Sequence, residues 1–183
     1  EKLLAGRQLS AMDLHNTGGD PQRFKVLFLA HCTREKGLFD AIEAVALANT
    51  QLAHGHAPLR VELTVAGEFL TAAEQAEFET RIQQPDLHDE LQRSLVRYAG
   101  FVRGETKKRA LVEADCFCFP TYYYAESFGL VVVEAMAAGL PIITTRWRSL
   151  SEMMPDGYPG LVEIRSPQRV AQAMRALMNR EAG

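Results

Sequence analysis

The sequence lacks the long apolar runs and the one-sided charge that mark several large classes of protein. No apolar stretch approaches the roughly 20 residues that a membrane-spanning helix needs. The start of the chain shows no signal-peptide pattern. The formal net charge is -3, so there is no overall basic field, and we expect no nucleic acid partner.

Cysteine is scarce as well. Cys32, Cys116 and Cys118 have no metal-ligand spacing and suggest no disulfide framework, so no residue is assigned to a metal. Cys116 and Cys118 alternate with phenylalanine, which is typical of a buried strand where cysteine serves as a small hydrophobic residue. A reducing, cytoplasmic compartment fits this usage best.

Three common catalytic or nucleotide-binding motifs are missing too. No G-x-G-x-x-G follows the first expected strand, and no G-x-x-x-x-G-K-[ST] occurs anywhere. No G-x-S-x-G elbow occurs either. These absences argue against classical dinucleotide binding, P-loop hydrolysis and serine hydrolase chemistry.

The length of 183 residues favours one domain. Residues 1–20 are weakly patterned and end in a turn-prone Gly-Gly-Asp-Pro, which indicates a lead-in or linker before a domain at 21–183. The first residue is Glu1 and not Met, so we expect the chain to be part of a longer protein.

Strand and helix patterns alternate along the domain. Strands are expected at 24–30, 59–66, 95–99, 116–119, 141–144 and 161–164, and helices at 36–53, 71–84, 105–114, 127–138 and 166–179. This alternation predicts an α/β fold, a doubly wound, parallel, Rossmann-like sheet of about six strands with helices on both faces. Such sheets bind ligands at the carboxyl ends of their strands, which directs attention to the loops at 31–37 and 121–129.

The segment 120–143 is the most informative part of the chain. Glu134 is surrounded from Phe128 to Ala138 by apolar residues and glycine. The three valines before it favour a strand, but the length of the segment and its small-residue ending favour a helix. A helix that is apolar all round is buried, so Glu134 should be satisfied by protein or ligand donors. A structural pairing with an arginine is the alternative.

Glu126 precedes Glu134 with seven residues between them, about 12 Å along a helix at roughly 1.5 Å per residue, a length comparable with a nucleotide sugar. Gly129 lets the backbone approach a ligand, and free amides at a helix N-terminus favour a diphosphate. The alternatives are a solvated loop acid at Glu126 and a glycine needed only for packing.

Arg34 and Lys36 follow the first strand, where a cation can neutralise phosphate. A solvated basic turn is the alternative. His31 either hydrogen-bonds a phosphate or caps the end of the strand.

With these residues together, the chain resembles the C-terminal, donor-binding half of glycosyltransferase family 4 enzymes, which have the two-domain GT-B fold. The match covers roughly 24–178, and its most specific part is the E-x7-E signature within 126–141. Supporting matches are Glu-Lys-Gly at 35–37, Ala-Gly-Glu at 66–68, Tyr-Ala-Gly-Phe-Val at 98–102, and Glu152 ahead of Asp-Gly at 156–157.

The resemblance implies a role for each matching residue. Glu134 would bind the ribose hydroxyls of the nucleotide, and Glu126 would face the donor sugar. Lys36 would bind phosphate and stabilise the departing nucleoside diphosphate, so Glu126 and Lys36 are the implied catalytic residues. The full implied donor site comprises His31, Arg34, Lys36, Phe101, Val102, Glu126, Ser127, Phe128, Gly129, Leu130 and Glu134, with base contacts from the backbone near Phe101 and Val102. Family members are retaining enzymes that need no metal or other cofactor.

Two positions depart from the family pattern. His31 replaces the arginine usual five residues before the lysine, so the second phosphate cation is His31 when protonated, or Arg34, or absent. Trp147 and Arg148 stand where Gly-Gly is common. Arg146 or Arg148 is a candidate for the missing charge.

We therefore expect the donor half of a retaining hexosyltransferase that uses a UDP-, GDP- or ADP-sugar. The acceptor domain would be an N-terminal part of the parent protein, without which this chain transfers little or no sugar. The alternative is a non-catalytic nucleotide-sugar-binding or regulatory module; a GT-B epimerase or phosphorylase is disfavoured by the E-x7-E spacing. We expect a cytoplasmic protein, with any attachment to the inner membrane face made through the parent protein.

Overall fold

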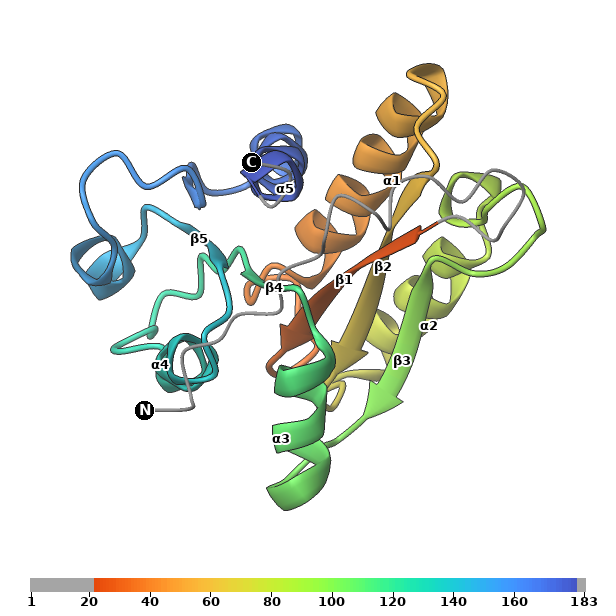
Figure 1. Cartoon of the computed structure of the whole chain (residues 1–183). Helices are drawn as coiled ribbons and strands as arrows, with labels where there is room; N and C mark the ends of the chain where they lie inside the picture. Colours follow the sequence, from red (N-terminus) through yellow and green to blue (C-terminus); the bar gives the residue numbers. More distant parts are fainter. Residues whose placement is uncertain (1–21, 181–183) are drawn as a thin grey trace.

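The computed structural model describes residues 22–180, so the lead-in predicted for 1–20 lies outside the described residues. The strands are β1 Gln22–Leu29, β2 Leu59–Ala66, β3 Val96–Gly100, β4 Cys116–Phe119, β5 Ile142–Thr145 and β6 Leu161–Val162. The α-helices are α1 Leu38–His54, α2 Ala72–Ile82, α3 Gly104–Glu113, α4 Leu130–Ala137 and α5 Pro167–Arg180. Two short 3-10 helices, η2 Pro85–Leu87 and η3 Arg148–Met153, complete the elements (Figure 1).

The six strands form one parallel sheet in the order β3-β2-β1-β4-β5-β6. From β1 the sheet grows in one direction through β2 and β3, and in the other through β4 to β6. The reversal of order therefore falls between β1 and β4, where sheets of this kind bind ligands at the carboxyl ends of the strands. The predicted doubly wound, Rossmann-like fold is confirmed.

Helices cover both faces of this sheet. Figure 1 shows α3 and α4 on one face, while α1 and α5 pack side by side on the other. All four residues of β4 are buried, as is usual for a central parallel strand. Cys116 and Cys118 are among them and are buried, which confirms their predicted role as small hydrophobic residues.

Several element ends follow the local sequence signals. The hydroxyl of Thr71 accepts a hydrogen bond from the Glu74 amide at 3.2 Å, and α2 begins at the next residue. Gly55 caps the end of α1, and Pro167 is the first residue of α5. However, β6 ends at Val162, two residues earlier than predicted, because the chain turns at residues 164–165, where Arg165 has a left-handed φ of 51°.

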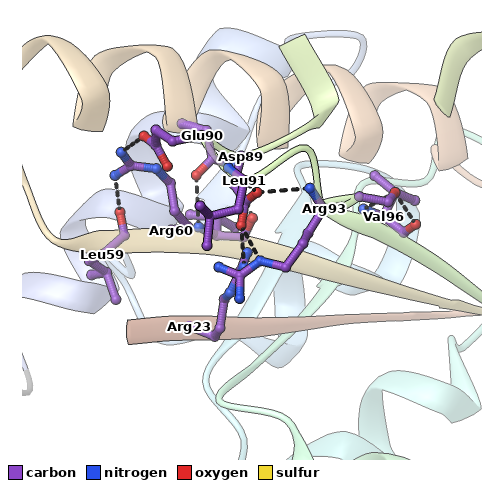
Figure 2. A network of polar contacts seen from close by, with 11 residues as sticks. Arg23, Leu59, Arg60, Asp89, Glu90, Leu91, Arg93 and Val96 are labelled. Atoms are coloured by element: carbon purple, nitrogen blue, oxygen red, sulfur yellow. Dashed lines mark hydrogen bonds and ion pairs between the residues drawn. The ribbon is translucent and has the colours of Figure 1, made fainter. Parts of the chain in front are cut away.

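A polar network far from the carboxyl ends ties the segment after α2 to the sheet (Figure 2). The Asp89 side chain is fully buried and accepts hydrogen bonds from Arg23 Nη2 at 2.6 Å and Arg93 Nε at 2.7 Å. Burial alone would raise the Asp89 pKa, but the hydrogen bonds from Arg93 and Arg23 outweigh it, so the pKa lies well below its usual range. Beside it, Arg60 pairs with Glu90. Because Arg23 lies near the start of β1, this network belongs to the amino edge of the sheet.

Candidate functional site

The two loops at the reversal point of the sheet meet in a largely buried ion pair. Lys36 lies between β1 and α1, and Glu126 lies between β4 and α4. The Lys36 Nζ is 2.7 Å from Glu126 Oε2, and the two side chains are only 17% and 9% exposed. Thr121 places its hydroxyl 3.5 Å from the same carboxylate oxygen. Burying such a pair costs desolvation energy, so the pair is weak evidence for stability.

Close packing of the backbone holds these loops together. Gly37 has a φ of 84°, and a Cβ at this position would stand 2.3 Å from the Pro120 carbonyl oxygen. The amide of Tyr122 donates to the Glu35 carbonyl at 2.8 Å, and the Thr121 hydroxyl reaches the same carbonyl at 3.2 Å. The two loops that the sequence analysis singled out therefore lie together.

Two aromatic rings lie against the Lys36 ammonium, and the sequence analysis assigned neither of them to the site. The Lys36 ammonium lies 4.4 Å from the centroid of the Tyr123 ring and 5.7 Å from that of Phe119. Trp147, from the loop after β5, donates its indole N–H to the Tyr123 carbonyl at 2.8 Å. In the sequence, the run of three tyrosines shortly after the buried strand β4 was the signal that could have identified Tyr123 as a site residue.

The turn into α4 requires a glycine. Gly129 adopts a left-handed conformation with φ 57°, and a Cβ there would stand 2.7 Å from the Leu150 side chain. The carbonyl of the neighbouring Ser127 accepts a hydrogen bond from the Ser149 hydroxyl. Phe128 and Leu130, on either side of the glycine, are 55% and 72% exposed. The left-handed φ, together with the approach of the Leu150 side chain, disfavours any other residue at position 129.

The prediction for Glu134 is wrong in one respect. The helix exists, but only Val132 and Ala135 on it are buried. The Glu134 carboxylate is 45% exposed and pairs with Lys107 of α3 at 2.5 Å. An eight-residue helix that packs on the sheet with one side leaves its other apolar residues uncovered, and composition could not reveal which side that is.

The expected separation of Glu126 and Glu134 along a helix is wrong as well. Glu126 precedes α4, which begins at Leu130, so the two glutamates do not lie on one continuous helix. The buried carboxylate of the signature is Glu126, and the accessible one is Glu134.

The remaining candidates lie around this pair in different environments. The Arg34 guanidinium stacks over the Phe39 ring at 4.5 Å and pairs with Glu77 of α2, whose hydrogen bond raises the arginine pKa. His31 is exposed and precedes the buried Cys32. In the first turn of α1, burial raises the pKa of Asp40 despite the positive charge of nearby arginines.

The loops after β3 and β5 hold the other candidates. Phe101 is 62% exposed, whereas Val102 is buried. Arg146 Nε lies 3.3 Å from Glu163, and the Arg148 guanidinium stacks 5.3 Å over Trp147. The structure therefore brings Lys36 and Glu126 into contact, and it pairs or stacks Arg34, Arg146 and Arg148 with other side chains.

Two features are absent from residues 22–180. No group of three or more His, Cys, Asp or Glu side chains in this range is arranged to hold a metal ion. No helix in the same range has both the length and the apolar character needed to cross a membrane.

Comparison with known proteins places the chain in a family. Residues 23–180 match the family described as glycosyl transferases group 1. The amylovoran biosynthesis glycosyltransferase AmsK of Erwinia amylovora is 31% identical over 163 residues, which are 87% of this chain and 36% of AmsK. The phosphatidyl-myo-inositol mannosyltransferase of Mycolicibacterium smegmatis is 34% identical over 112 residues, 61% of this chain and 28% of that protein.

Among solved structures, Anabaena HepE in complex with UDP-glucose has the same fold. Its TM-score is 0.69 at 19% identity, and the alignment covers 87% of this chain and 41% of HepE. The chain thus spans well under half the length of these relatives. Because the family match extends over nearly the whole described range, the chain belongs to the group 1 glycosyl transferases, of which it forms the Rossmann-like, donor-binding domain.

Proposed function

We propose that this domain binds a nucleotide sugar between the β1 and β4 loops and serves a retaining glycosyltransferase. The observation that carries the proposal is the Lys36–Glu126 pair, 2.7 Å apart at the carboxyl ends of neighbouring parallel strands. A diphosphate entering this site would replace the carboxylate as the partner of Lys36. The freed Glu126 would then accept hydrogen bonds from hydroxyls of the donor sugar.

The chemistry assigned to these residues is electrostatic. As the bond between the sugar and the diphosphate breaks, negative charge grows on the departing nucleoside diphosphate. The Lys36 ammonium and the amides at the N-terminus of α4, near Phe128 to Leu130, stabilise that charge. These groups take the place of a metal ion in the proposal. Glu134 is accessible on α4 and would accept hydrogen bonds from the ribose hydroxyls.

UDP is the first candidate for the nucleotide, because the structurally similar HepE was solved with UDP-glucose. The acceptor and its binding groups belong to the rest of the parent protein in this proposal. The domain alone would therefore transfer little or no sugar. We also propose that the parent protein works in the cytoplasm, with any membrane contact made outside this domain.

Calorimetry of the domain with UDP, GDP and ADP tests the proposal. One nucleotide should bind, and Lys36→Ala should weaken its binding about 10- to 100-fold, the effect of losing a charge-assisted hydrogen bond. Lys108→Ala is the matched control, since that side chain is 71% exposed on α3. If the folded domain binds none of the three nucleotides, the proposed function is wrong.

A further inference from the structure

Tyr123 contacts the proposed site through both its backbone and its ring, yet none of the roles assigned above uses it. Its carbonyl accepts the Glu126 amide at 3.0 Å and the Trp147 indole N–H at 2.8 Å. Its own amide donates to the Thr121 hydroxyl at 3.2 Å. Its ring face lies 4.4 Å from the Lys36 ammonium. One residue thus contacts both members of the central ion pair.

This arrangement restricts the lysine. A lysine side chain has a long, flexible stem, and its ammonium is a mobile point charge. An aromatic ring face attracts a cation within about 6 Å, so the Tyr123 ring limits where the ammonium can lie. Phe119 lies on the same ammonium at 5.7 Å. When a diphosphate displaces Glu126, the aromatic contacts still hold the charge in place.

Trp147 in turn holds Tyr123. Its indole N–H is part-buried and bonds to the Tyr123 carbonyl, which joins the loop after β5 to the loop after β4. The Thr145 hydroxyl of β5 makes a second link to the Thr121 carbonyl of the same loop. These contacts join two segments more than twenty residues apart in the sequence.

We infer that Tyr123, anchored by Trp147, is a positioning residue that keeps the Lys36 ammonium directed at the donor diphosphate. The role toward the donor diphosphate rests on the proposed function. The contact between ring and ammonium can also be tested without any nucleotide.

A double-mutant cycle on UDP affinity tests the action through lysine. Tyr123→Leu should weaken UDP binding about five-fold, in the range of a partly desolvated cation–π contact. Tyr123→Phe keeps the ring and should stay within about two-fold of wild type. In a Lys36→Met background, Tyr123→Leu should change affinity less than about two-fold, because the group it positions is gone. A loss of equal size in both backgrounds would show a merely structural role and overturn the inference.

Tyr124→Leu is the matched control for this cycle. Tyr124 is the next residue along the loop and is 69% exposed, and its ring packs against Tyr123 with centroids 5.2 Å apart. Its removal should leave UDP affinity within about two-fold of wild type. A loss as large as that of Tyr123→Leu would mean that the effect is not specific to Tyr123, which contradicts the assignment.

NMR of the reductively 13C-methylated chain tests the contact directly. The chain has five lysines, so the Lys36 signal can be assigned by substitution. It should be shifted upfield by the ring current of Tyr123, remain shifted in Tyr123→Phe, and return toward the exposed-lysine position in Tyr123→Leu. Trp147→Phe removes the indole donor but keeps a ring. It should move the Lys36 signal part of the way toward the exposed-lysine position, while the Lys108 signal stays unchanged. An unshifted Lys36 signal in the wild type overturns the inference, whereas absence of nucleotide binding with a shifted signal overturns only the proposed function.

Discussion

Gly37 lies so close to the carbonyl oxygen of Pro120 that a Cβ atom would stand 2.3 Å away. The backbone of the loop after β1 therefore packs against the residue that follows β4, and Lys36 lies next to Glu126. The contact allows no side chain at position 37, and the left-handed φ of 84° disfavours one independently.

Gly37→Ala should therefore be strongly destabilising. We expect a loss of about 3 kcal/mol or more in the free energy of unfolding, because left-handed strain of about 1–2 kcal/mol adds to a backbone clash. Urea denaturation measures it. Gly139→Ala separates the two contributions, since Gly139 has a φ of 78° with nothing within 4 Å of its Cβ position, and it should lose only the strain. Equal losses for both variants would contradict the packing argument.

Glu126→Gln should change the preference between UDP and a UDP-sugar. In the free domain the Glu126 carboxylate is the partner of Lys36, so neutralising it removes a competitor of the diphosphate, and UDP should bind up to about five-fold more tightly. The UDP-sugar should bind more weakly relative to UDP than in wild type, because its hydroxyls lose a charged acceptor. Parallel titrations measure the ratio. Weaker UDP binding by the variant would argue against competition for Lys36.

Glu134→Ala should abolish discrimination between UDP and 2′-deoxy-UDP. If the carboxylate accepts the ribose hydroxyls, wild type should prefer UDP by about 10-fold or more, and the variant should bind both alike. Competition calorimetry gives the two ratios.

Lys107→Ala is the companion variant for that experiment. The Lys107–Glu134 pair is partly exposed, so its loss should change stability by less than about 1 kcal/mol. It should preserve the preference for UDP, because Glu134 remains. Loss of the preference in Lys107→Ala would assign the discrimination to the pair and not to the carboxylate alone.

The Asp89 network predicts a specific acid sensitivity. The folded-state pKa of Asp89 is depressed, so its stabilising contribution is complete above the unfolded-state pKa, about 3.9 for an aspartate. It is lost as the pH falls from there through the lower folded-state pKa. Unfolding in urea should therefore become easier below about pH 4.

Asp89→Asn should remove much of that pH dependence. It should also lower stability near neutral pH by about 3 kcal/mol, because Arg23 and Arg93 lose their charged partner. Asp156→Asn, at an exposed site, is the control and should retain the wild-type profile. A wild-type profile in Asp89→Asn would show that other carboxylates govern acid unfolding.

Local sequence patterns were sufficient for most of the secondary structure. The Thr71 cap, the continuous apolar run of β4 and proline at the start of α5 each act through neighbours in the chain, so the predicted elements are confirmed. Their alternation also predicted the parallel, doubly wound sheet, because short connections between strands leave few other arrangements.

Burial around the signature could not be predicted in the same way. The apolar neighbours of Glu134 indicated a buried carboxylate, but the sheet covers only the side of α4 that carries Val132 and Ala135. Glu126 stands between Ala125 and Ser127 and gave no such indication, yet Lys36 from the loop after β1 pairs with it and the carboxylate is only 9% exposed.

The amino-acid sequence by itself determined the order of strands and helices, the fold class and the two loops at which chemistry is expected, since these depend on periodicity, capping and chain connectivity. Only the tertiary structure decided which acid is buried with Lys36, that the Tyr123 ring lies against the ammonium, and that Trp147 holds Tyr123. Those contacts join segments up to 90 residues apart, from Lys36 to Glu126, and arise from how the ends of separate strands pack against one another.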